Sequence, residues 1–373
     1  MKVVTILGTR PEIIRLSRII PELDRHCDHV LVHTGQNDDP NLSDRFFREL
    51  QIRPPDIHLG VQTNGFAHQA AEILARGGDI LEQVRPDRVL ILGDTNSGLL
   101  SLVAARMGIP VYHMEAGNRC YDNRVPEEIN RRIIDHSSAV LMPYTHRSME
   151  NLLREGIERQ RIYVIGNPLY EVIQTWSAQI DSCGILERLN LTAGQFFLAT
   201  LHRSENVDLP VRLESFCRGL SRIAHDYDQP LVLSLHPRTA DKLQKFGLRI
   251  LSESVLVCEP LGFVEFVKLE RNARCVLTDS GTVQEECCIF HVPNVTLRDV
   301  TERAETVEAG SNILSGPAPD SILQATQVAL SVGCDWEPPR EYVQLNVSRA
   351  VLKIVLGYEH IRAAKCAGVS APY

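Results

Sequence analysis

Short runs of Val, Ile and Leu alternate with longer amphipathic segments along almost the whole chain, and this alternation narrows the possible folds most. Near-continuous apolar strands of this kind are buried on both faces, as in parallel sheets covered by helices. The sequence therefore predicts an α/β protein. The predicted strands are Val3–Leu7, Val30–His33, Arg88–Leu92, Val111–His113, Ala139–Met142, Tyr163–Ile165, Phe196–Thr200, Leu231–Leu235, Val255–Val257, Cys275–Thr278 and Asn294–Leu297.

The segments between these strands carry apolar residues at three- and four-residue spacing, which is the period of an amphipathic helix. The chain has 373 residues, too many for one ordinary core, and turn residues at 166–168 mark a boundary. We predict two Rossmann-like domains facing a cleft, residues 1–168 and 169–352, with residues 353–373 packing back on the first. The predicted helices are Glu12–Asp24, Ala67–Gln83, Leu99–Met107, Glu127–His136, Val211–Asp226, Val283–Phe290 and Val347–Tyr358.

The composition is that of a soluble globular protein and excludes several other classes. Hydrophobic residues make up 44% of the chain and charged residues 23%. A net charge of -8 argues against a general nucleic-acid binder. No stretch approaches ~18 consecutive apolar residues, so no membrane span is expected. The 10 cysteines form no C-x-x-C pair, which favours small core residues in a reducing, cytoplasmic compartment over zinc or disulfides.

Two strand ends in the first half carry groups that bind anions or move protons. In α/β proteins, ligands bind at the carboxyl ends of strands. A glycine turn, Gly8–Glu12, runs from the first strand into a helix, where Arg10 and Arg15 would add charge at an anion site. An ordinary strand-to-helix turn would look the same. Asp94 follows the strand Arg88–Leu92, either as a helix N-cap or as a proton carrier.

The runs 113–119 and 125–132 gather three carboxylates and several arginines at a strand end and a helix start. On an exposed helix, its glutamates and arginines four residues apart would form ordinary ion pairs. The position of these groups favours a catalytic role instead. Glu115 and Asp94 each follow a strand, and the carboxyl ends of those two strands should be neighbours.

Strand ends in the second half carry basic and hydroxyl groups. His202-Arg203 and His236-Pro237-Arg238 each follow a strand, and a histidine beside an arginine suits acid/base work or a phosphate contact. Ser280-Gly281-Thr282 would present N–H groups and hydroxyls to an anion at a helix N-terminus. Glu286 is placed to accept hydrogen bonds from ribose hydroxyls, and Phe266 either stacks on a base or belongs to the core.

The two halves thus offer different chemistry: mostly carboxylates in the first, mostly phosphate and ribose contacts in the second. A cleft of that kind suits a nucleotide-activated sugar. No metal cluster is apparent in the sequence, so the arginines and helix dipoles would have to neutralise the diphosphate. We expect no metal and no cofactor.

The ordered motifs resemble the non-hydrolysing UDP-N-acetylglucosamine 2-epimerase family. They are GTRPE, GDT, EAG-x-R, PEE-x-NR, H-R-x-E-N, HPR, DSG-x-x-x-EE and TER, and they run from Gly8 to about Arg303. The resemblance implies a GT-B-like fold with the active site between two Rossmann-like domains, usually in a homodimer. It also implies anti elimination of UDP to a 2-acetamidoglycal, followed by re-addition with inversion at C2.

The resemblance assigns roles by motif position. Asp94, Glu115, Glu127 and His202 match the family's acid/base set. The implied substrate-binding set is Arg10, Arg15, Arg131, Arg203, Glu205, His236, Arg238, Phe266, Ser280, Gly281, Thr282, Glu286 and Arg303. Glu128 and Arg132 are expected to remain an ordinary surface pair.

Several positions depart from the commoner family pattern. Arg15 stands where many members have lysine, which resembles the branch that forms UDP-N-acetyl-L-fucosamine. The loop 36–39 lacks the usual aromatic, which puts the family's activation by a second substrate molecule in doubt, and Ser204 replaces a frequent glutamate.

The default prediction is reversible epimerisation of UDP-GlcNAc to UDP-ManNAc for surface polysaccharide or glycoconjugate synthesis. The alternatives are the L-fucosamine reaction, a glycosyltransferase of the same fold, a hydrolysing epimerase that releases UDP, and a catalytically silent sugar-nucleotide sensor.

Overall fold

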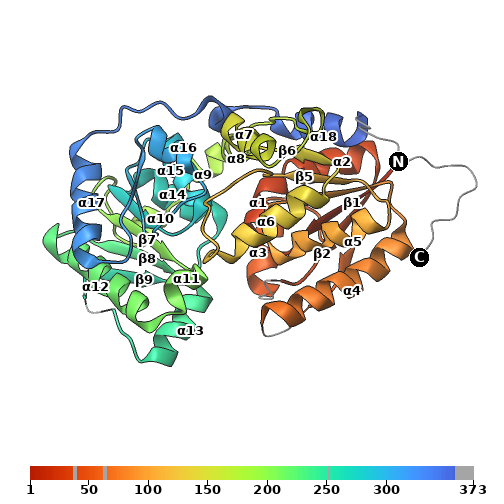
Figure 1. The fold of residues 1–373 in the computed structure, drawn as a ribbon. Coiled ribbons are helices and arrows are strands. Elements are labelled where there is room, and N and C mark those ends of the chain that lie inside the picture. The colour runs from red at the N-terminus through yellow and green to blue at the C-terminus, as the bar shows by residue number, and fades with distance from the viewer. Residues whose placement is uncertain (37–39, 62–64, 251, 358–373) are drawn as a thin grey trace, which may run out of the picture.

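Two parallel sheets with covering helices form the molecule (Figure 1). The computed structural model describes residues 1–36, 40–61, 65–250 and 252–357. The strand order is β3-β2-β1-β4-β5-β6 in one six-stranded sheet and β12-β11-β10-β7-β8-β9 in the other, and every pairing is parallel. The predicted α/β fold class is therefore confirmed. The strands are β1 Lys2–Leu7, β2 Asp28–His33, β3 Ile57–His58, β4 Arg88–Leu92, β5 Val111–Met114, β6 Val140–Met142, β7 Phe197–Leu201, β8 Leu231–Leu235, β9 Val255–Cys258, β10 Cys275–Thr278, β11 Asn294–Thr296 and β12 Asn312–Leu314.

Helices of very different length connect these strands. Three short 3-10 turns also occur: η1 Asn96–Leu99, η2 Arg159–Arg161 and η3 Arg340–Val343. The α-helices are α1 Arg10–Leu16, α2 Ile19–His26, α3 Pro40–Glu49, α4 Phe66–Val84, α5 Leu100–Arg106, α6 Pro126–Ser137, α7 His146–Arg154, α8 Leu169–Thr175, α9 Ser177–Asp181, α10 Ile185–Arg188, α11 Ser204–Val207, α12 Pro210–Asp226, α13 Pro237–Phe246, α14 Phe263–Asn272, α15 Gly281–Phe290, α16 Ala304–Glu308, α17 Pro319–Ser331 and α18 Val347–Gly357.

The predicted helix Glu12–Asp24 is wrong as one element, because the chain breaks it into α1 and α2. Pro21 explains the break. It has no N–H to donate to the carbonyl of Ser17, and its ring would clash with that carbonyl in a continuous helix. The N–H of Ser17 accordingly bonds the closer carbonyl of Ile14, which tightens the last turn of α1.

The predicted strand Tyr163–Ile165 is also wrong. The N–H groups of Tyr163 and Ile165 bond the carbonyls of Leu141 and Pro143, but the resulting bridge to β6 is an isolated one, between Leu141 and the preceding residue Ile162. Two short strands, β3 and β12, were not predicted; they contain 2 and 3 residues, too few to show a periodic pattern.

Alternate side chains of β1 enter two different cores. Val3 and Leu7 belong to the cluster that also contains residues of α1, α2 and α18, whereas Val4 and Ile6 pack with residues of α4 and α5. Both faces of the first sheet are therefore buried, as the apolar runs predicted. The second sheet has two corresponding clusters.

The C-terminal helix α18 returns to the first sheet. Val347, Val351 and Val355 are buried in the core beside α2, and Figure 1 shows the blue chain crossing from the second sheet to reach that position. Residues 353–357 of the predicted returning segment belong to α18; residues 358–373 lie outside the described residues. The limits 1–168 and 169–352 stay a prediction.

Candidate active site

The candidate site forms where strand ends of the two sheets meet. Asp94 follows β4 and Glu115 follows β5, while His202 follows β7 and Asp279 follows β10. β4 and β5 are paired, and the N–H of Gly93 bonds the carbonyl of Met114 at 3.0 Å. The ends that carry Asp94 and Glu115 are therefore neighbours, as expected from the sequence.

Glu115 adopts a conformation that is rare for a residue with a side chain. Its φ is 65°, in the left-handed region, and the residue is buried. Such strain persists only where the surroundings fix it, and it clusters at functional sites. The Glu115 carboxylate is held by Arg15 at 2.7 Å, by Asn118 at 3.2 Å and by Arg303.

Arg15, Glu115, Glu285 and Arg303 form a buried cluster that joins the two sheets. Arg15 on α1 reaches Glu115 at 2.7 Å, and Glu285 on α15 at 2.6 Å. Arg303 contacts both carboxylates as well. Burial alone would lower the pKa of Arg15, but the two carboxylates outweigh it and raise that pKa above its ordinary value. The Glu115 carboxylate thus lies at the meeting point of two arginines.

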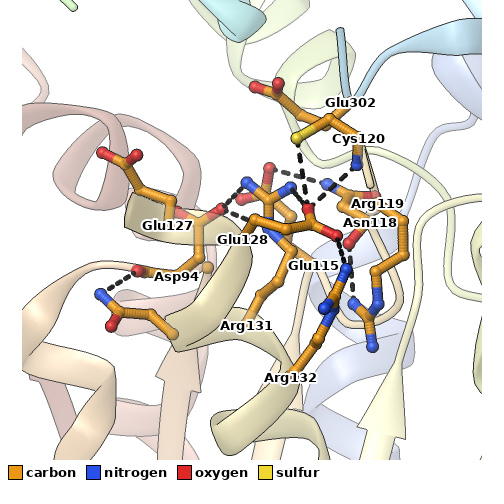
Figure 2. Close-up of polar contacts among 12 residues, drawn as sticks. Asp94, Glu115, Asn118, Arg119, Cys120, Glu127, Glu128, Arg131, Arg132 and Glu302 are labelled. Carbon is orange, nitrogen blue, oxygen red and sulfur yellow. Dashed lines mark hydrogen bonds and ion pairs between the residues drawn. The ribbon is translucent and has the colours of Figure 1, made fainter. Parts of the chain in front are cut away.

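Asp94 and Glu128 share one buried arginine. Arg131 on α6 binds the Asp94 carboxylate at 2.6 Å through Nη2 and Glu128 at 2.8 Å through Nη1. Glu128 does pair with Arg132, at 2.7 Å as predicted, but the predicted surface position is wrong because Glu128 is fully buried. Figure 2 shows its carboxylate between Arg131, Arg132 and the N–H of Cys120, which donates at 3.0 Å. Glu128 therefore fixes the loop after Glu115 against α6.

Glu127 is the least constrained of the three candidate carboxylates. It does not pair with Arg131 four residues later; its Oε1 lies 3.4 Å from Nη1 of Arg203, in the other half of the molecule. Its Oε2 is buried, and no described group donates a hydrogen bond to it. This oxygen therefore has room for a donor that the described residues do not supply.

His202 is oriented by a buried aspartate that was not predicted as a site residue. Nδ1 of His202 lies 3.0 Å from Oδ1 of Asp279, which also accepts the N–H groups of His202 and Arg203 and the amide of Asn206. Burial would raise the pKa of Asp279, but the His202 imidazole and these donors lower it to about 2. Two sequence signals could have found Asp279: it directly follows a strand, and it begins the motif DSG-x-x-x-EE.

A cleft with about 760 Å³ of empty space lies between the halves and contains many predicted substrate contacts. Arg10 and Phe46 line it from the first half. From the second half, the lining includes His202, His236, Phe266, Ser280, Thr282 and Glu286. Gly281 begins α15 at its wall, and a Cβ there would lie 2.7 Å from Oε1 of Glu302, so a side chain at this position would displace the Glu302 carboxylate.

Burial changes the ionisation of three groups that line this cleft. Burial, His202 and Arg10 lower the pKa of His236 to about 3, so its imidazole is neutral. Burial and then the nearby Glu285 raise the pKa of Glu286 to about 8. Burial lowers the pKa of Arg10. The cleft therefore combines a cation, a neutral imidazole and a weakly acidic carboxyl group, all able to bind a polar ligand.

Several predicted site residues lie outside the cleft lining: the carboxylates Asp94, Glu115 and Glu127, and the predicted contacts Arg15, Arg131, Arg203, Glu205, Arg238, Gly281 and Arg303. Arg238 is exposed on α13 and pairs with Asp208, and Glu205 lies 3.5 Å from Nε of the buried Arg298. Glu302, missed as a site residue, binds Arg298 at 2.7 Å and Arg203 at 3.2 Å. Burial would raise the pKa of Glu302, but these arginines hold it well below its ordinary range.

The GTRPE motif contains a further buried carboxyl group. Glu12 accepts hydrogen bonds from the N–H of Gly8, the hydroxyl of Thr9 and the hydroxyl of Thr95. Burial raises its pKa to about 7 even though these donors oppose the shift. Glu12 therefore links the Arg10 turn to the Asp94 loop.

Three further predictions concern the loop 36–39, metal binding and membrane spans. Of the loop 36–39, residues 37–39 lie outside the described residues, while Gln36 accepts the N–H of Ser97 at 3.0 Å. Across residues 1–357 apart from the gaps, no three His, Cys, Asp or Glu side chains gather as a metal site would need. Within the same part of the chain, no helix has the length and apolarity to cross a bilayer.

Comparison with known proteins identifies close relatives of the whole chain. A family model described as UDP-N-acetylglucosamine 2-epimerase matches residues 21–356. A UDP-N-acetylglucosamine 2-epimerase of Methanocaldococcus jannaschii is 41% identical over 347 residues, covering 91% of this chain and 95% of the relative. A UDP-2,3-diacetamido-2,3-dideoxy-D-glucuronate 2-epimerase of Pseudomonas aeruginosa is 38% identical over 334 residues, 88% of this chain and 92% of that protein.

Solved structures agree with these relatives. The M. jannaschii UDP-GlcNAc 2-epimerase in complex with UDP-GlcNAc and UDP has a TM-score of 0.91 at 39% identity and covers 95% of this chain and 99% of that chain. The glycosyltransferase WaaG, at 14% identity and a TM-score of 0.60, shares the fold alone, which confirms the GT-B-like architecture. The chain therefore belongs to the non-hydrolysing UDP-N-acetylglucosamine 2-epimerase family, whose members are isomerases.

Proposed function

We propose that this protein epimerises a UDP-2-acetamido sugar at C2, with UDP-GlcNAc and UDP-ManNAc as the default pair. The observation that carries the proposal is that carboxylates of the first half meet arginines of the second half beside the cleft. Glu115 binds Arg303, and Glu127 lies 3.4 Å from Arg203. Arg15, which holds Glu115, also contacts Thr282 of the cleft lining at 3.1 Å. The relative from M. jannaschii, whose crystal structure contains UDP-GlcNAc and UDP, supports the same ligand class.

The chemistry explains why such a site needs several proton carriers. C2 bears an acetamido group and is not adjacent to a carbonyl, so its proton is barely acidic. Its removal becomes feasible when UDP leaves C1 at the same time, which gives a 2-acetamidoglycal. Re-addition of UDP with a proton delivered to the opposite face inverts C2, so one carrier is required on each face.

Three carboxylates supply these carriers in the proposed mechanism. Arg15 and Arg303 hold Glu115, and Arg131 holds Asp94, so the arginines position both carboxylates to act as bases. Glu127, with one oxygen free of donors, suits a group that exchanges protons repeatedly.

The leaving diphosphate is proposed to lie against the second half. Asp279 occupies Nδ1 of His202 as a hydrogen-bond partner, so Nε2 would be left to contact a phosphate oxygen in the cleft. Arg10 and the N-terminus of α15 at Ser280–Thr282 would stabilise the departing charge. Glu286 and Phe266 would contact the ribose and the base.

Turnover in D2O tests this mechanism. We expect deuterium at C2 of both the product and the recovered substrate, because the proton lost from C2 is replaced from solvent. Glu127→Gln should abolish exchange and epimerisation together while UDP still binds. Epimerisation of UDP-GlcNAc without any deuterium at C2 would contradict elimination and re-addition.

A second substrate class is favoured by one relative. The P. aeruginosa protein, which is 38% identical to this chain, is a 2-epimerase of a UDP-linked diacetamido glucuronate. Arg15, where many family members have lysine, is a feature that resembles the L-fucosamine-forming branch. Separate incubations with three donors distinguish these substrates, with each reaction followed by NMR. The donors are UDP-GlcNAc, the UDP-diacetamido glucuronate and the UDP-6-deoxy-L-hexosamine. Conversion without an acceptor excludes a glycosyltransferase, and stoichiometric release of free UDP would indicate a hydrolysing enzyme.

The wider setting is also a proposal. We expect a homodimer, which light scattering would measure, and a role in supplying precursors for surface polysaccharides or glycoconjugates.

A further inference from the structure

His113 is a fully buried histidine to which the proposed mechanism gives no role. It lies on β5, one strand residue before the loop that carries Glu115. Its Nδ1 is 2.9 Å from Oδ1 of Asp135 on α6, and its Nε2 is 2.8 Å from the carbonyl oxygen of Gly93. Both ring nitrogens therefore have a partner at hydrogen-bond distance.

Both of these partners can only accept hydrogen bonds. A carbonyl oxygen has no proton to donate. Asp135 is ionised, because its Oδ2 already accepts from Arg119 at 2.8 Å and from the N–H of Gly117 at 3.2 Å. Burial would raise the pKa of Asp135, but His113 and Arg119 outweigh burial and lower it. A neutral imidazole would turn one lone pair toward an acceptor, so the contacts require two N–H groups on His113.

The charges around the ring balance. Asp135 lies between the ring and Arg119, and the Arg119 guanidinium also binds Glu155 at the end of α7 at 2.5 Å. Two cations thus face two carboxylates across β5, α6 and α7. A buried imidazolium is tolerable in such a setting because it is paired and fully hydrogen-bonded.

The His113–Asp135 pair holds both loops that carry candidate proton carriers. Gly93, whose carbonyl is fixed by Nε2, has a φ of 75° and directly precedes Asp94. Gly117, whose N–H is fixed by Asp135, lies two residues after the strained Glu115 and has a φ of 80°. Gly93 is also held by its own N–H on the carbonyl of Met114, and Gly117 by the amide of Asn151 on α7. The His113–Asp135 pair is the contact that connects the two loops to each other.

We propose that His113 is a positioning residue, a buried imidazolium that sets the distance between the Asp94 and Glu115 loops. This inference rests on the proposed function, since it assigns those two loops to proton transfer. His113 touches no substrate. It acts on the rate of the chemical step and not on nucleotide binding, because the UDP contacts come mainly from the second sheet.

The first test needs no substrate. Nitrogen NMR of protein labelled at histidine should show both ring nitrogens of His113 protonated at about pH 7, with the resonances assigned by their loss in His113→Gln. A spectrum with one protonated and one bare nitrogen would overturn the proposal, whatever the enzyme's activity.

The second test separates positioning from folding and from binding. His113→Gln should lower kcat at least about tenfold while the KM and the affinity for UDP stay within about twofold. His136→Gln is the matched control, because His136 is exposed on the same helix as Asp135 and pairs with Glu155 at 3.5 Å; it should change neither value. Unchanged kcat in His113→Gln would refute the role. Absence of epimerisation by the unaltered protein would instead refute the proposed function and leave the NMR result to decide the state of His113.

Discussion

At the scale of single residues, position 15 shows why arginine and lysine differ. The Arg15 guanidinium spans Glu115 at 2.7 Å and Glu285 at 2.6 Å, using separate nitrogens, whereas one lysine ammonium cannot reach both in the same geometry. Arg15→Lys should therefore lower kcat/KM at least about tenfold. Arg45→Lys is the control: Arg45 also pairs across the halves, with Glu265, but it is partly exposed and should change activity less than about twofold. Equal activity of Arg15→Lys and the unaltered protein would contradict the spanning role.

Asp279 predicts a particular response to acid. Its pKa is depressed to about 2 in the folded state, so it stabilises the fold fully above its ordinary pKa of 3.8 and loses that contribution as the pH falls toward 2. The contribution is on the order of 2 kcal/mol. Urea unfolding should show Asp279→Asn less stable than the unaltered protein at about pH 6, with the difference shrinking near pH 3. A difference that is independent of pH would mean that the carboxylate charge is not what stabilises the fold.

Residue types and order were enough to predict the main members of the site but not their partners. Asp94, Glu115 and His202 could be placed because each directly follows an apolar strand. Glu128 was misplaced at the surface, since its buried state depends on a loop that folds back over α6. Glu285 was missed as a site residue because its partner Arg15 is 270 positions away, a distance over which sequence spacing carries no information.

At the scale of elements, two glycines at the ends of connections differ in what surrounds them. Gly117 has a φ of 80°, and a Cβ there would lie 2.2 Å from the carbonyl oxygen of Ser148 on α7. Gly156, just after α7, has a φ of 83° but faces open space. Gly156→Ala should cost about 1 kcal/mol for backbone strain alone. Gly117→Ala should cost about 3 kcal/mol or more and inactivate the enzyme, because backbone of α7 must move.

Urea unfolding and initial rates measure both substitutions. If the two variants lost equal stability, the contact with α7 would not be the reason for glycine at position 117.

Elements were predictable where a local pattern encodes them. Buried strands such as β4 and β10 show as apolar runs, and amphipathic helices show by their period. The break between α1 and α2 was missed because the apolar period continues through it, although Pro21 forbids a continuous helix. The segment 163–165 is as apolar as a strand, but only its pairing with neighbours, a long-range property, decides that it is not one.

At the scale of the whole molecule, α18 ties the end of the described chain to its beginning. Val347, Val351 and Val355 are completely or almost completely buried beside α2. Each buried valine contributes about 1.5–3 kcal/mol, so removing residues 347–373 should destabilise the first sheet by several kcal/mol. Removal of residues 358–373 alone is the control. Thermal unfolding measures both, and equal melting of the two truncated chains would show that α18 adds nothing to the first core.

The return of α18 also sets an order for synthesis. The strands of the first sheet leave the ribosome early, yet the helix that covers α2 follows the entire second sheet. During translation, the nascent first sheet must therefore keep an apolar face of α2 open to water until the second sheet has been made. Chaperone contact with the growing chain should accordingly concentrate on this face and end only when α18 emerges.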